Sequence, residues 1–167
     1  MTNSESLGSD AEIRGELTVV RPAVEDDAEL LVRWHADPEV ARYWDDETFT
    51  REEMLERLGR PHVAAFVIEE RGRPVGYLQV WSEGGEGGLD LFLIPDARGR
   101  GLGPDAARAV ARHLRDARGW RRVTVDPYLW NAAAVRAWAR AGFRPVGERE
   151  PDVDHTARWL LMEFGDS

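Results

Sequence analysis

The stretch that decides the fold of this chain reads LDLFLIPDARGRGLGP and spans residues 89–104. Its first part, Leu89 to Ile94, is almost entirely apolar and predicts a buried strand that Pro95 ends. A loop of arginines and glycines follows, and we expect a helix to begin near Gly103 or Pro104. The inner face of that helix carries apolar residues at the spacing of a buried helical stripe, namely Ala107, Val110, Ala111 and Leu114.

The loop between this strand and this helix has the composition of an anion site. Glycines let backbone N–H groups face a ligand, and a helix N-terminus adds unpaired N–H groups and a positive dipole end. Arg98 and Arg100 add full positive charges. A pyrophosphate would fit, although a glycine-rich turn with solvated arginines has the same composition. The spacing matches neither the dinucleotide pattern nor the P-loop, whose lysine this chain lacks.

Length and composition indicate an ordinary globular domain. With 167 residues we expect a single domain at 15–167, after a disordered tail at 1–14. There is no apolar run of membrane length and no signal-peptide pattern, so we expect a cytoplasmic protein without a membrane partner. The net charge of −9 argues against a nucleic-acid partner and favours a cationic one. We expect a monomer or a homodimer.

Residue types that are rare or absent narrow the chemistry. The chain has no cysteine, which excludes disulfides, thiolate metal sites and an acyl-cysteine intermediate. Outside the two termini the only serine is Ser82, which argues against a serine hydrolase. The histidines are scattered without a metal-binding pattern, and we interpret them as surface or packing residues: His35, His62, His113 and His155.

Two acidic segments are candidates for binding a cation. Residues 43–47 read Tyr-Trp-Asp-Asp-Glu, and aromatic faces beside carboxylates suit an ammonium-bearing sugar through stacking and ion pairing. A loop whose aromatic side chains lie in the core and whose acidic side chains are solvated would have the same sequence pattern. Glu83 and Glu86 flank a glycine-rich connection, which is either a rim over a site or a plain hairpin loop.

The remaining pattern predicts a mixed α/β fold. Thr50 and Glu53 form a capping-box pattern that opens a helix. A turn at 71–74 joins two apolar strands, which form a three-strand meander with the central strand. The expected strands cover 17–21, 63–69, 75–81, 89–94, 121–126, 143–150 and 155–164, and the expected helices cover 24–36, a short segment from 38, 51–58, the segment after 103, and 131–141.

Three segments resemble the GCN5-related N-acetyltransferase superfamily and, within it, the aminoglycoside 6′-N-acetyltransferases. The strand LDLFL from Leu89 is similar to the family's Ile-Asp-Gln-Phe-Leu strand. The pattern Arg-x-x-Gly-x-Gly from Arg98 resembles the family's acetyl-CoA pyrophosphate loop. The run from Asp126-Pro127 through Asn131 to Ala-Gly-Phe at 141–143 matches without a gap. The similarity covers residues 17–164, and acetyltransferases of hydroxamate siderophores share much of it.

The resemblance implies a mostly antiparallel central sheet that is flanked by helices and splits between the central strand and the next. It implies acetyl-CoA as co-substrate, no metal, and direct transfer to an amine in a ternary complex. Asp90 matches the aspartate that binds the amine and accepts its proton. The pantetheine amides would pair with strand backbone around Phe92 and Ile94. The implied cofactor-binding residues are Phe92, Leu93, Ile94, Arg98, Gly99, Arg100, Gly101, Leu102, Gly103 and Asn131.

Substrate binding draws on the resemblance and on the acidic segments together. Asp126 matches a second family aspartate that binds substrate amines, and it could equally cap a strand end before Pro127. The candidate substrate-binding residues are Tyr43, Trp44, Asp45, Glu83, Asp90 and Asp126.

The sequence departs from the family pattern at two positions. Many relatives carry a tyrosine five residues before Phe143 as the acid that protonates the leaving thiolate, and this chain has Trp138. Indole donates a hydrogen bond but cannot give up its proton. Because a thiol has a pKa of only ~8.5, we expect slower protonation rather than loss of activity, with Tyr128 as a candidate substitute. Pro104 removes one N–H from the loop.

Three functions therefore stay open. The first is acetylation of the 6′-amine of a cationic aminoglycoside, which would give antibiotic resistance. The second is acetylation of another amine, such as a siderophore hydroxylysine or a protein N-terminus. The third is a coenzyme A-binding module without turnover, which Trp138 suggests.

Overall fold

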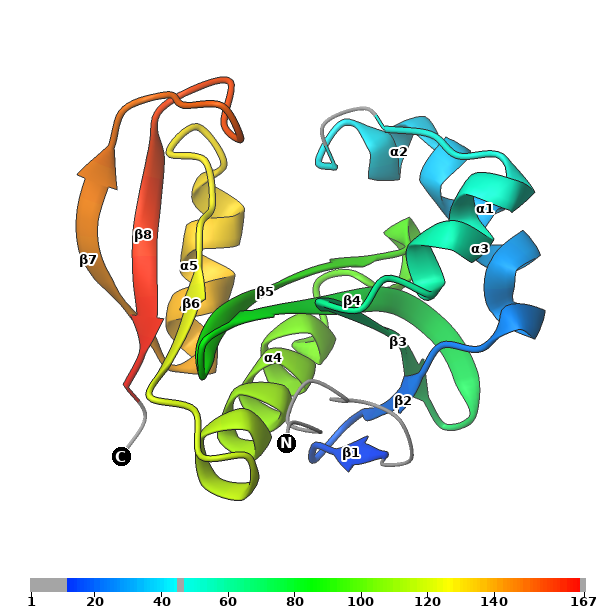
Figure 1. Cartoon of the computed structure of the whole chain (residues 1–167), viewed down its shortest axis with the longest axis horizontal. Coiled ribbons are helices and arrows are strands. Elements are labelled where there is room, and N and C mark those ends of the chain that lie inside the picture. The colour runs from blue at the N-terminus through cyan, green and yellow to red at the C-terminus, as the bar shows by residue number, and fades with distance from the viewer. Residues whose placement is uncertain (1–11, 45–46, 166–167) are drawn as a thin grey trace.

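The computed structural model describes residues 12–44 and 47–165 and contains one sheet with helices on both faces (Figure 1). The strands are β1 Ile13–Arg14, β2 Val19–Pro22, β3 Val63–Glu70, β4 Arg73–Glu83, β5 Glu86–Leu93, β6 Arg122–Val125, β7 Phe143–Arg149 and β8 Trp159–Phe164. The helices are α1 Ala28–Ala36, α2 Pro38–Ala41, α3 Arg51–Leu58, α4 Leu102–Arg112 and α5 Ala132–Ala141, with short helical turns at 25–27, 95–97 and 113–117.

The eight strands lie in the order β1-β2-β3-β4-β5-β6-β8-β7. Neighbouring strands in this order are antiparallel except β5 and β6, which run parallel. Figure 1 shows α4 under one face of the sheet and α1 to α3 over the other, with β6, β7 and β8 forming a separate wing beside α5. Among the described residues, no helix is both long enough and apolar enough to cross a membrane.

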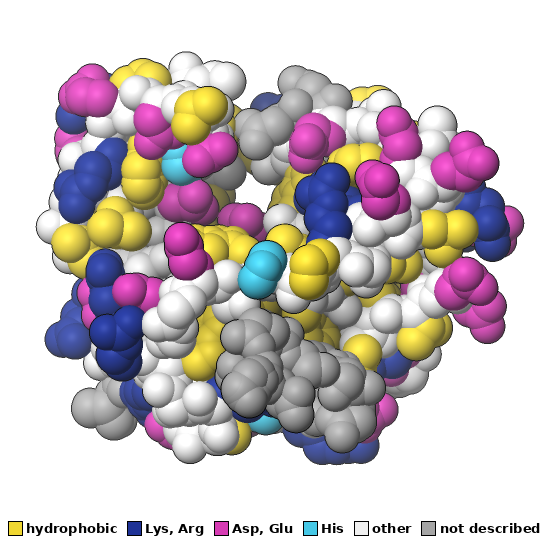
Figure 2. All heavy atoms as spheres, in the orientation of Figure 1, with side chains coloured by type: hydrophobic (Ala, Val, Ile, Leu, Met, Phe, Trp, Pro, Cys, Tyr) yellow, Lys and Arg dark blue, Asp and Glu magenta, His cyan; other side chains and the backbone are white. Residues whose placement is uncertain are grey.

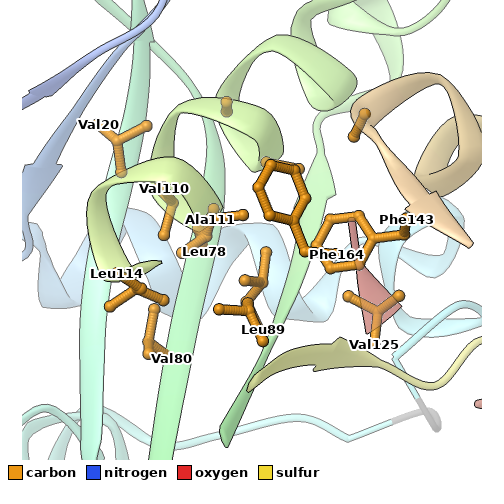
Figure 3. Packing of buried hydrophobic residues seen from close by; sticks show 14 of the residues in the cluster. Val20, Leu78, Val80, Leu89, Val110, Ala111, Leu114, Val125, Phe143 and Phe164 are labelled. Carbon is orange, nitrogen blue, oxygen red and sulfur yellow. The ribbon is translucent and has the colours of Figure 1, made fainter. Parts of the chain in front are cut away.

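Strand alternation divides the core between the two faces of the sheet. Leu78 and Val80 on β4 belong to the larger cluster, which packs against the buried face of α4 (Figure 3). Tyr77 and Phe92 point the other way and pack against α1 and α3. The predicted stripe on α4 is confirmed, because its members are at most 2 % exposed: Ala107, Val110, Ala111 and Leu114.

The sheet splits at β5. This strand pairs with β6 only from Glu86 to Gly88, opposite Arg122 to Thr124. Gly88 allows the close approach, since a Cβ there would lie 2.6 Å from the Thr124 carbonyl oxygen. Beyond Gly88 the strands diverge, so the β6 side of Asp90 to Leu93 is left without a strand partner in the described sheet. The expected split, mostly antiparallel sheet is confirmed.

Several sequence-based boundaries were wrong. The tail was assigned to residue 14, but β1 pairs Ile13 with Val20 and buries Ile13 in the α4-side core. Residues 1–11 lie outside the described part of the chain. The loop expected from Glu83 to Gly88 is only the pair Gly84–Gly85, because both adopt positive φ and close a tight hairpin.

Two other strands begin at different residues than expected. β4 begins at Arg73, because the turn before it is only the pair Arg71–Gly72, both with positive φ. β8 begins at Trp159 rather than at His155. The residues just before β8 therefore form a loop that turns back toward the end of β6.

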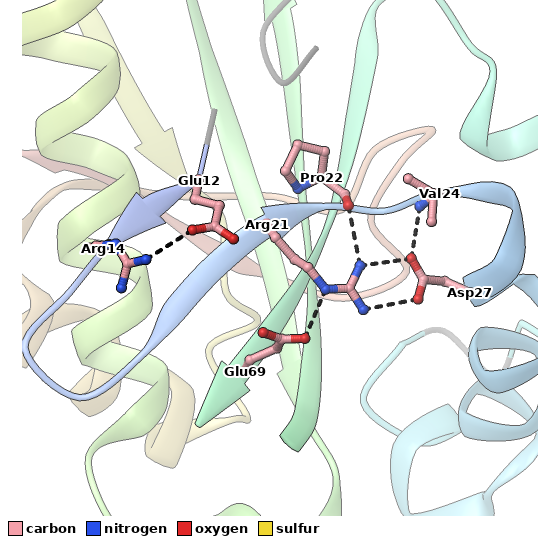
Figure 4. Close-up of polar contacts among 7 residues, drawn as sticks. All are labelled: Glu12, Arg14, Arg21, Pro22, Val24, Asp27 and Glu69. Carbon is pink, nitrogen blue, oxygen red and sulfur yellow. Dashed lines mark hydrogen bonds and ion pairs between the residues drawn. The ribbon is translucent and has the colours of Figure 1, made fainter. Parts of the chain in front are cut away.

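Three carboxylates fix the N-terminal segment to the sheet, to α4 and to the start of α1. Asp105 in the first turn of α4 accepts hydrogen bonds from the N–H groups of residues 16–18 and from the Thr18 hydroxyl. Arg21 donates to both oxygens of Asp27 and to Glu69, which ties β2 and β3 to the start of α1 (Figure 4). Burial would raise the pKa of Asp27, but the Arg21 guanidinium outweighs it and lowers that pKa.

Candidate functional site

Two adjoining cavities occupy the split between β5 and the β6–β8 wing. The loop cavity, beside the glycine-rich loop, measures about 500 Å³, and the acidic cavity, nearer α2 and α3, measures about 310 Å³. Both are lined by Tyr43, Leu91, Asn131, Ala134 and Trp138. Figure 2 shows the hollow between the two lobes with acidic side chains on both sides of it. A molecule in one cavity would therefore reach a molecule in the other.

The loop cavity has an anion-binding end. Gly101 caps α4 with φ +82°, a left-handed conformation that favours glycine, and Gly99 has the same φ. The first N–H groups of α4 have no intrahelical acceptor and lie at the positive end of its dipole. Pro104, in the first turn, takes one N–H from this set. The opposite wall is mostly apolar and comes from α5, with Ala133, Ala134, Ala137, Trp138 and Arg140.

The β5 backbone groups that face this cavity belong to Leu91 and Leu93. The Ile94 N–H donates to the Val75 carbonyl, so it points toward β4. In an extended strand the direction alternates, so Phe92 also points its backbone toward β4. The expected pairing around Phe92 and Ile94 is therefore wrong by one residue. Ile94 is also absent from the described lining, whereas Leu91, Phe92 and Leu93 belong to it.

The two loop arginines have different roles. Arg98 lines the loop cavity, donates to the Leu93 and Glu39 carbonyls, and lies 5.5 Å from the Tyr43 ring centre, so it links the loop to α2. Arg100 instead binds both carboxylate oxygens of Glu70, at 2.7 and 2.9 Å, and lies outside the described lining. Its expected position at the cofactor is not observed, because Glu70 satisfies its guanidinium.

The acidic cavity is lined by carboxylates from separate segments of the chain: Glu47, Asp90, Asp126 and Asp154. Asp90 pairs in register with Gln79, so both side chains lie on the α1–α3 face. Gln79 accepts hydrogen bonds from Arg57 and from the Tyr77 hydroxyl, at 3.1 and 3.0 Å. Burial raises the pKa of Tyr77, which keeps its phenol neutral. The two expected aspartates, Asp90 and Asp126, line the same cavity.

Aromatic rings form the rim of the acidic cavity. Tyr43 stacks on Trp130 at 6.2 Å, and Trp130 stacks on Tyr128 at 5.7 Å, so this row of rings connects the two lobes. Trp130 is 56 % exposed, and sequence reasoning missed it because one of its two partners, Tyr43, lies in a distant segment. Trp44 lines the cavity but packs edge-on against Tyr77 and Phe92 in the core.

Of the expected substrate residues, one is outside the described part of the chain and another lies away from both cavities. Asp45 falls outside the described residues. Glu83 lies at the tip of the β4–β5 hairpin opposite Glu86, away from the described lining of both cavities. Glu86 forms ion pairs with Arg121 and Arg122, so this connection is a hairpin tip rather than a rim.

His155 is a lining residue that sequence reasoning treated as surface or packing. Its Nε2 lies 2.8 Å from Asp126 Oδ2, and its Nδ1 lies 2.8 Å from Asp152 Oδ1. Burial would lower the pKa of His155, but the hydrogen bonds and charges of Asp152 and Asp126 outweigh it and raise that pKa. In the sequence, Asp152 and Asp154 precede His155, and this pattern could have indicated that His155 forms ion pairs.

Asn131, at the N-cap of α5, and Trp138, within α5, line both cavities. The Asn131 side chain accepts from the Ala134 N–H and caps α5. Trp138 lines both cavities and packs edge-on against Phe143. Tyr128, the candidate acid, lines the acidic cavity, and its hydroxyl accepts from the Thr156 N–H.

No group of three or more metal-ligating side chains occurs in the described part of the chain.

The structure thus combines a split sheet with a glycine-rich loop at the head of α4, and comparison of the sequence with known families identifies the class of protein. The profile of the GNAT acetyltransferase domain matches residues 23–151, and the chain belongs to this family. It is therefore an acetyltransferase of the GNAT type.

Individual relatives and solved structures are similar to this chain to different degrees. The chain is 25 % identical over 149 residues to the aminoglycoside N(6′)-acetyltransferase type 1 of Klebsiella pneumoniae, covering 77 % of this chain and 74 % of that protein. A GNAT acetyltransferase from Bacillus anthracis superposes with a TM-score of 0.81 at 17 % identity, covering 92 % and 98 %. The aminoglycoside acetyltransferase AAC(6′)-Ib in complex with ribostamycin and coenzyme A superposes with a TM-score of 0.75 at 23 % identity, covering 89 % and 93 %. At these identities the superpositions show a shared fold.

Proposed function

We propose that this protein transfers the acetyl group of acetyl-CoA to a primary amine, the 6′-amine, of a cationic aminoglycoside. The observation that carries this proposal is an acidic cavity that opens into an anion-binding cavity through the split in the sheet. The 25 % identity to an aminoglycoside N(6′)-acetyltransferase supports the same acceptor. In a cell the reaction would lower the antibiotic's affinity for its target and give resistance.

The chemistry of the loop cavity suits the pantetheine arm and the pyrophosphate of acetyl-CoA. Its loop end offers the N–H groups of Gly101, Leu102 and Gly103 for a pyrophosphate. The backbone of Leu91 and Leu93 faces the split and would pair with pantetheine amides, although the Leu93 carbonyl already accepts from Arg98. Acetyl-CoA supplies an activated thioester whose carbonyl carbon would lie at the junction of the two cavities.

The acidic cavity would hold the acceptor as an ammonium ion. Asp90 and Asp126 attract the cation, and Asp90 takes the proton that the nitrogen must lose before it attacks. As the C–N bond forms and the C–S bond breaks, a β5 N–H that faces the split, such as that of Leu91, stabilises the charge on the acetyl oxygen. The nitrogen loses its second proton as the amide forms, and this proton passes through solvent to the departing thiolate. Trp138 can donate a hydrogen bond near that thiolate but supplies no proton.

The rim favours a sugar over a small alkylamine as the acceptor. Stacked rings at Tyr43, Trp130 and Tyr128 offer flat faces to the apolar side of a sugar ring and to its ammonium groups. Glu47 and Asp154 add carboxylates beyond those at the reaction centre, as a substrate with several amines requires.

A second candidate acceptor is an amino acid such as N-hydroxylysine. Arg57 lines the acidic cavity and would pair with a substrate carboxylate, which an aminoglycoside lacks. This candidate predicts a low KM for hydroxylysine and a large rise in that KM in Arg57→Gln.

The test is a thiol-release assay with acetyl-CoA against kanamycin, ribostamycin, N-hydroxylysine and a peptide amine. We expect turnover with the aminoglycosides, and a fall of about 10²–10³ in kcat/KM for Asp90→Asn. Asp96→Asn is the control, because Asp96 is an exposed surface acid paired with Arg73. Preference for hydroxylysine or the peptide would contradict the proposal. Coenzyme A binding without turnover of any amine would instead identify a binding module.

A further inference from the structure

The loop between β7 and β8 returns to the end of β6 and brings a histidine against the acidic cavity. We propose that His155, as an imidazolium, is a positioning residue that fixes the Asp126 carboxylate for the ammonium group of the acceptor. This inference rests on the proposed function in one respect, since it assumes that the acceptor is a cation bound at Asp126.

The hydrogen-bond geometry requires a doubly protonated ring. Each nitrogen of His155 lies 2.8 Å from a carboxylate oxygen, one from Asp126 and one from Asp152. A neutral imidazole carries a single N–H and could donate to only one of these acceptors. The side chain is only 12 % exposed, so water cannot readily replace either partner.

The ring is held rigidly enough to orient its partner. It stacks on Trp159 at 4.1 Å with an interplanar angle of 10°, and the edge of Tyr128 meets its other side at 5.9 Å. Asp152 is itself fixed by the Asp154 N–H. Because Nε2 engages Asp126 Oδ2, an acceptor ammonium would use Oδ1.

The protonation state of His155 determines the net charge of the residues around it in the acidic cavity. The titratable groups that face His155 are Asp126 from the end of β6, Tyr128 from the following loop, and Asp152 and Asp154 from its own loop. With the ring protonated, Asp126 and Asp152 together with His155 carry one net negative charge. Burial opposes the charge, but the hydrogen bonds and charges of Asp152 and Asp126 outweigh it, raise the pKa of His155 and so favour this protonated form.

Two substitutions separate positioning from packing. His155→Phe keeps a flat ring against Trp159 but loses both donors, and His155→Gln keeps one N–H donor for Asp126. We expect His155→Phe to raise the KM for kanamycin about tenfold, with kcat and the KM for acetyl-CoA changed less than twofold, and His155→Gln to restore part of the loss. His62→Asn, at an exposed position, is the control. An unchanged kanamycin KM in His155→Phe would overturn the proposal.

A second measurement does not depend on the acceptor or on the folding of those variants. The histidine ring protons are titrated by NMR in the wild-type protein and in Asp126→Asn. We expect the midpoint of His155 to lie above the ordinary value for a histidine and to fall in Asp126→Asn. A midpoint that does not change would overturn the proposal. If the midpoint falls but no aminoglycoside is acetylated, the contact stands and the proposed function fails.

Discussion

The two cavities are built in opposite ways. The loop cavity is formed mainly by one continuous stretch, residues 91–104, and its ligand-facing groups are largely backbone atoms. The acidic cavity collects side chains from α3, β4, β5 and α5 and from residues 43, 44, 47, 126–128, 131, 154 and 155. A binding site made of backbone needs a local conformation, whereas one made of side chains needs distant segments to meet. A local sequence motif is therefore enough to predict the class of cofactor. The side chains proposed to bind the acceptor are brought together only by the tertiary structure.

The largest expected effect is on the KM for acetyl-CoA, from a substitution that distorts only the loop cavity. Gly101→Val places a β-branched residue at φ +82°, a conformation that costs it about 1–3 kcal/mol and that displaces the first N–H groups of α4. We expect the KM for acetyl-CoA to rise about 10- to 100-fold, with the acceptor KM little changed. Steady-state kinetics with each substrate varied in turn measures both constants.

Gly119→Val is the matched control for this change. Gly119 also has a positive φ and open space around its Cβ position, but it lies after α4 and away from the described lining of the two cavities. Equal loss of acetyl-CoA affinity in both variants would mean that general backbone strain, rather than the loop, is responsible.

The next effect is on the free energy of unfolding, from a carboxylate in the first turn of α4 that holds the N-terminal segment. Asp105→Ala removes the acceptor for three backbone N–H groups and one hydroxyl of the N-terminal segment. We expect the free energy of unfolding to fall by about 2–3 kcal/mol, measured by urea denaturation. Asp116→Ala, whose exposed carboxylate pairs with the adjacent Arg115, should change it little. Unchanged stability in Asp105→Ala would show that this segment is held by other contacts.

A smaller effect tests the rim of the acidic cavity. Trp130→Ala removes the middle ring of the stack, which is worth about 0.5–1.5 kcal/mol for an aromatic pair. We expect the kanamycin KM to rise about 2- to 10-fold while the KM for acetyl-CoA stays constant. Trp130→Phe should recover most of the affinity. A change confined to the acetyl-CoA constant would place this ring with the other cavity.

The smallest expected effect is a difference between two arginine substitutions in the KM for acetyl-CoA. Arg100→Ala should change the KM for acetyl-CoA by less than about twofold, because Arg100 is already paired with Glu70 on an exposed surface. Arg140→Ala should raise it more, since Arg140 lines the loop cavity. The reverse order would mean that the cofactor draws Arg100 away from Glu70.

The sequence by itself determined the parts of this protein that depend on neighbouring residues. The strand, the glycine turn and the helix at 89–114 follow from apolar spacing and from glycine's access to positive φ, and the structure confirms them. The capping box of Thr50 and Glu53 is confirmed for the same reason, because its two hydrogen bonds join residues three apart. Such contacts are encoded locally, so a short stretch is sufficient to predict them.

Only the tertiary structure decided which distant side chains meet. The contact between His155 and Asp126 joins residues 29 apart and exists because β8 returns beside β6. The pairing of Arg100 with Glu70, the burial of Ile13 and the backbone register of Leu91 and Leu93 depend on how strands align across the sheet. No short stretch encodes that alignment, since it results from packing the whole core, and a shift of one residue reverses which groups face a cavity.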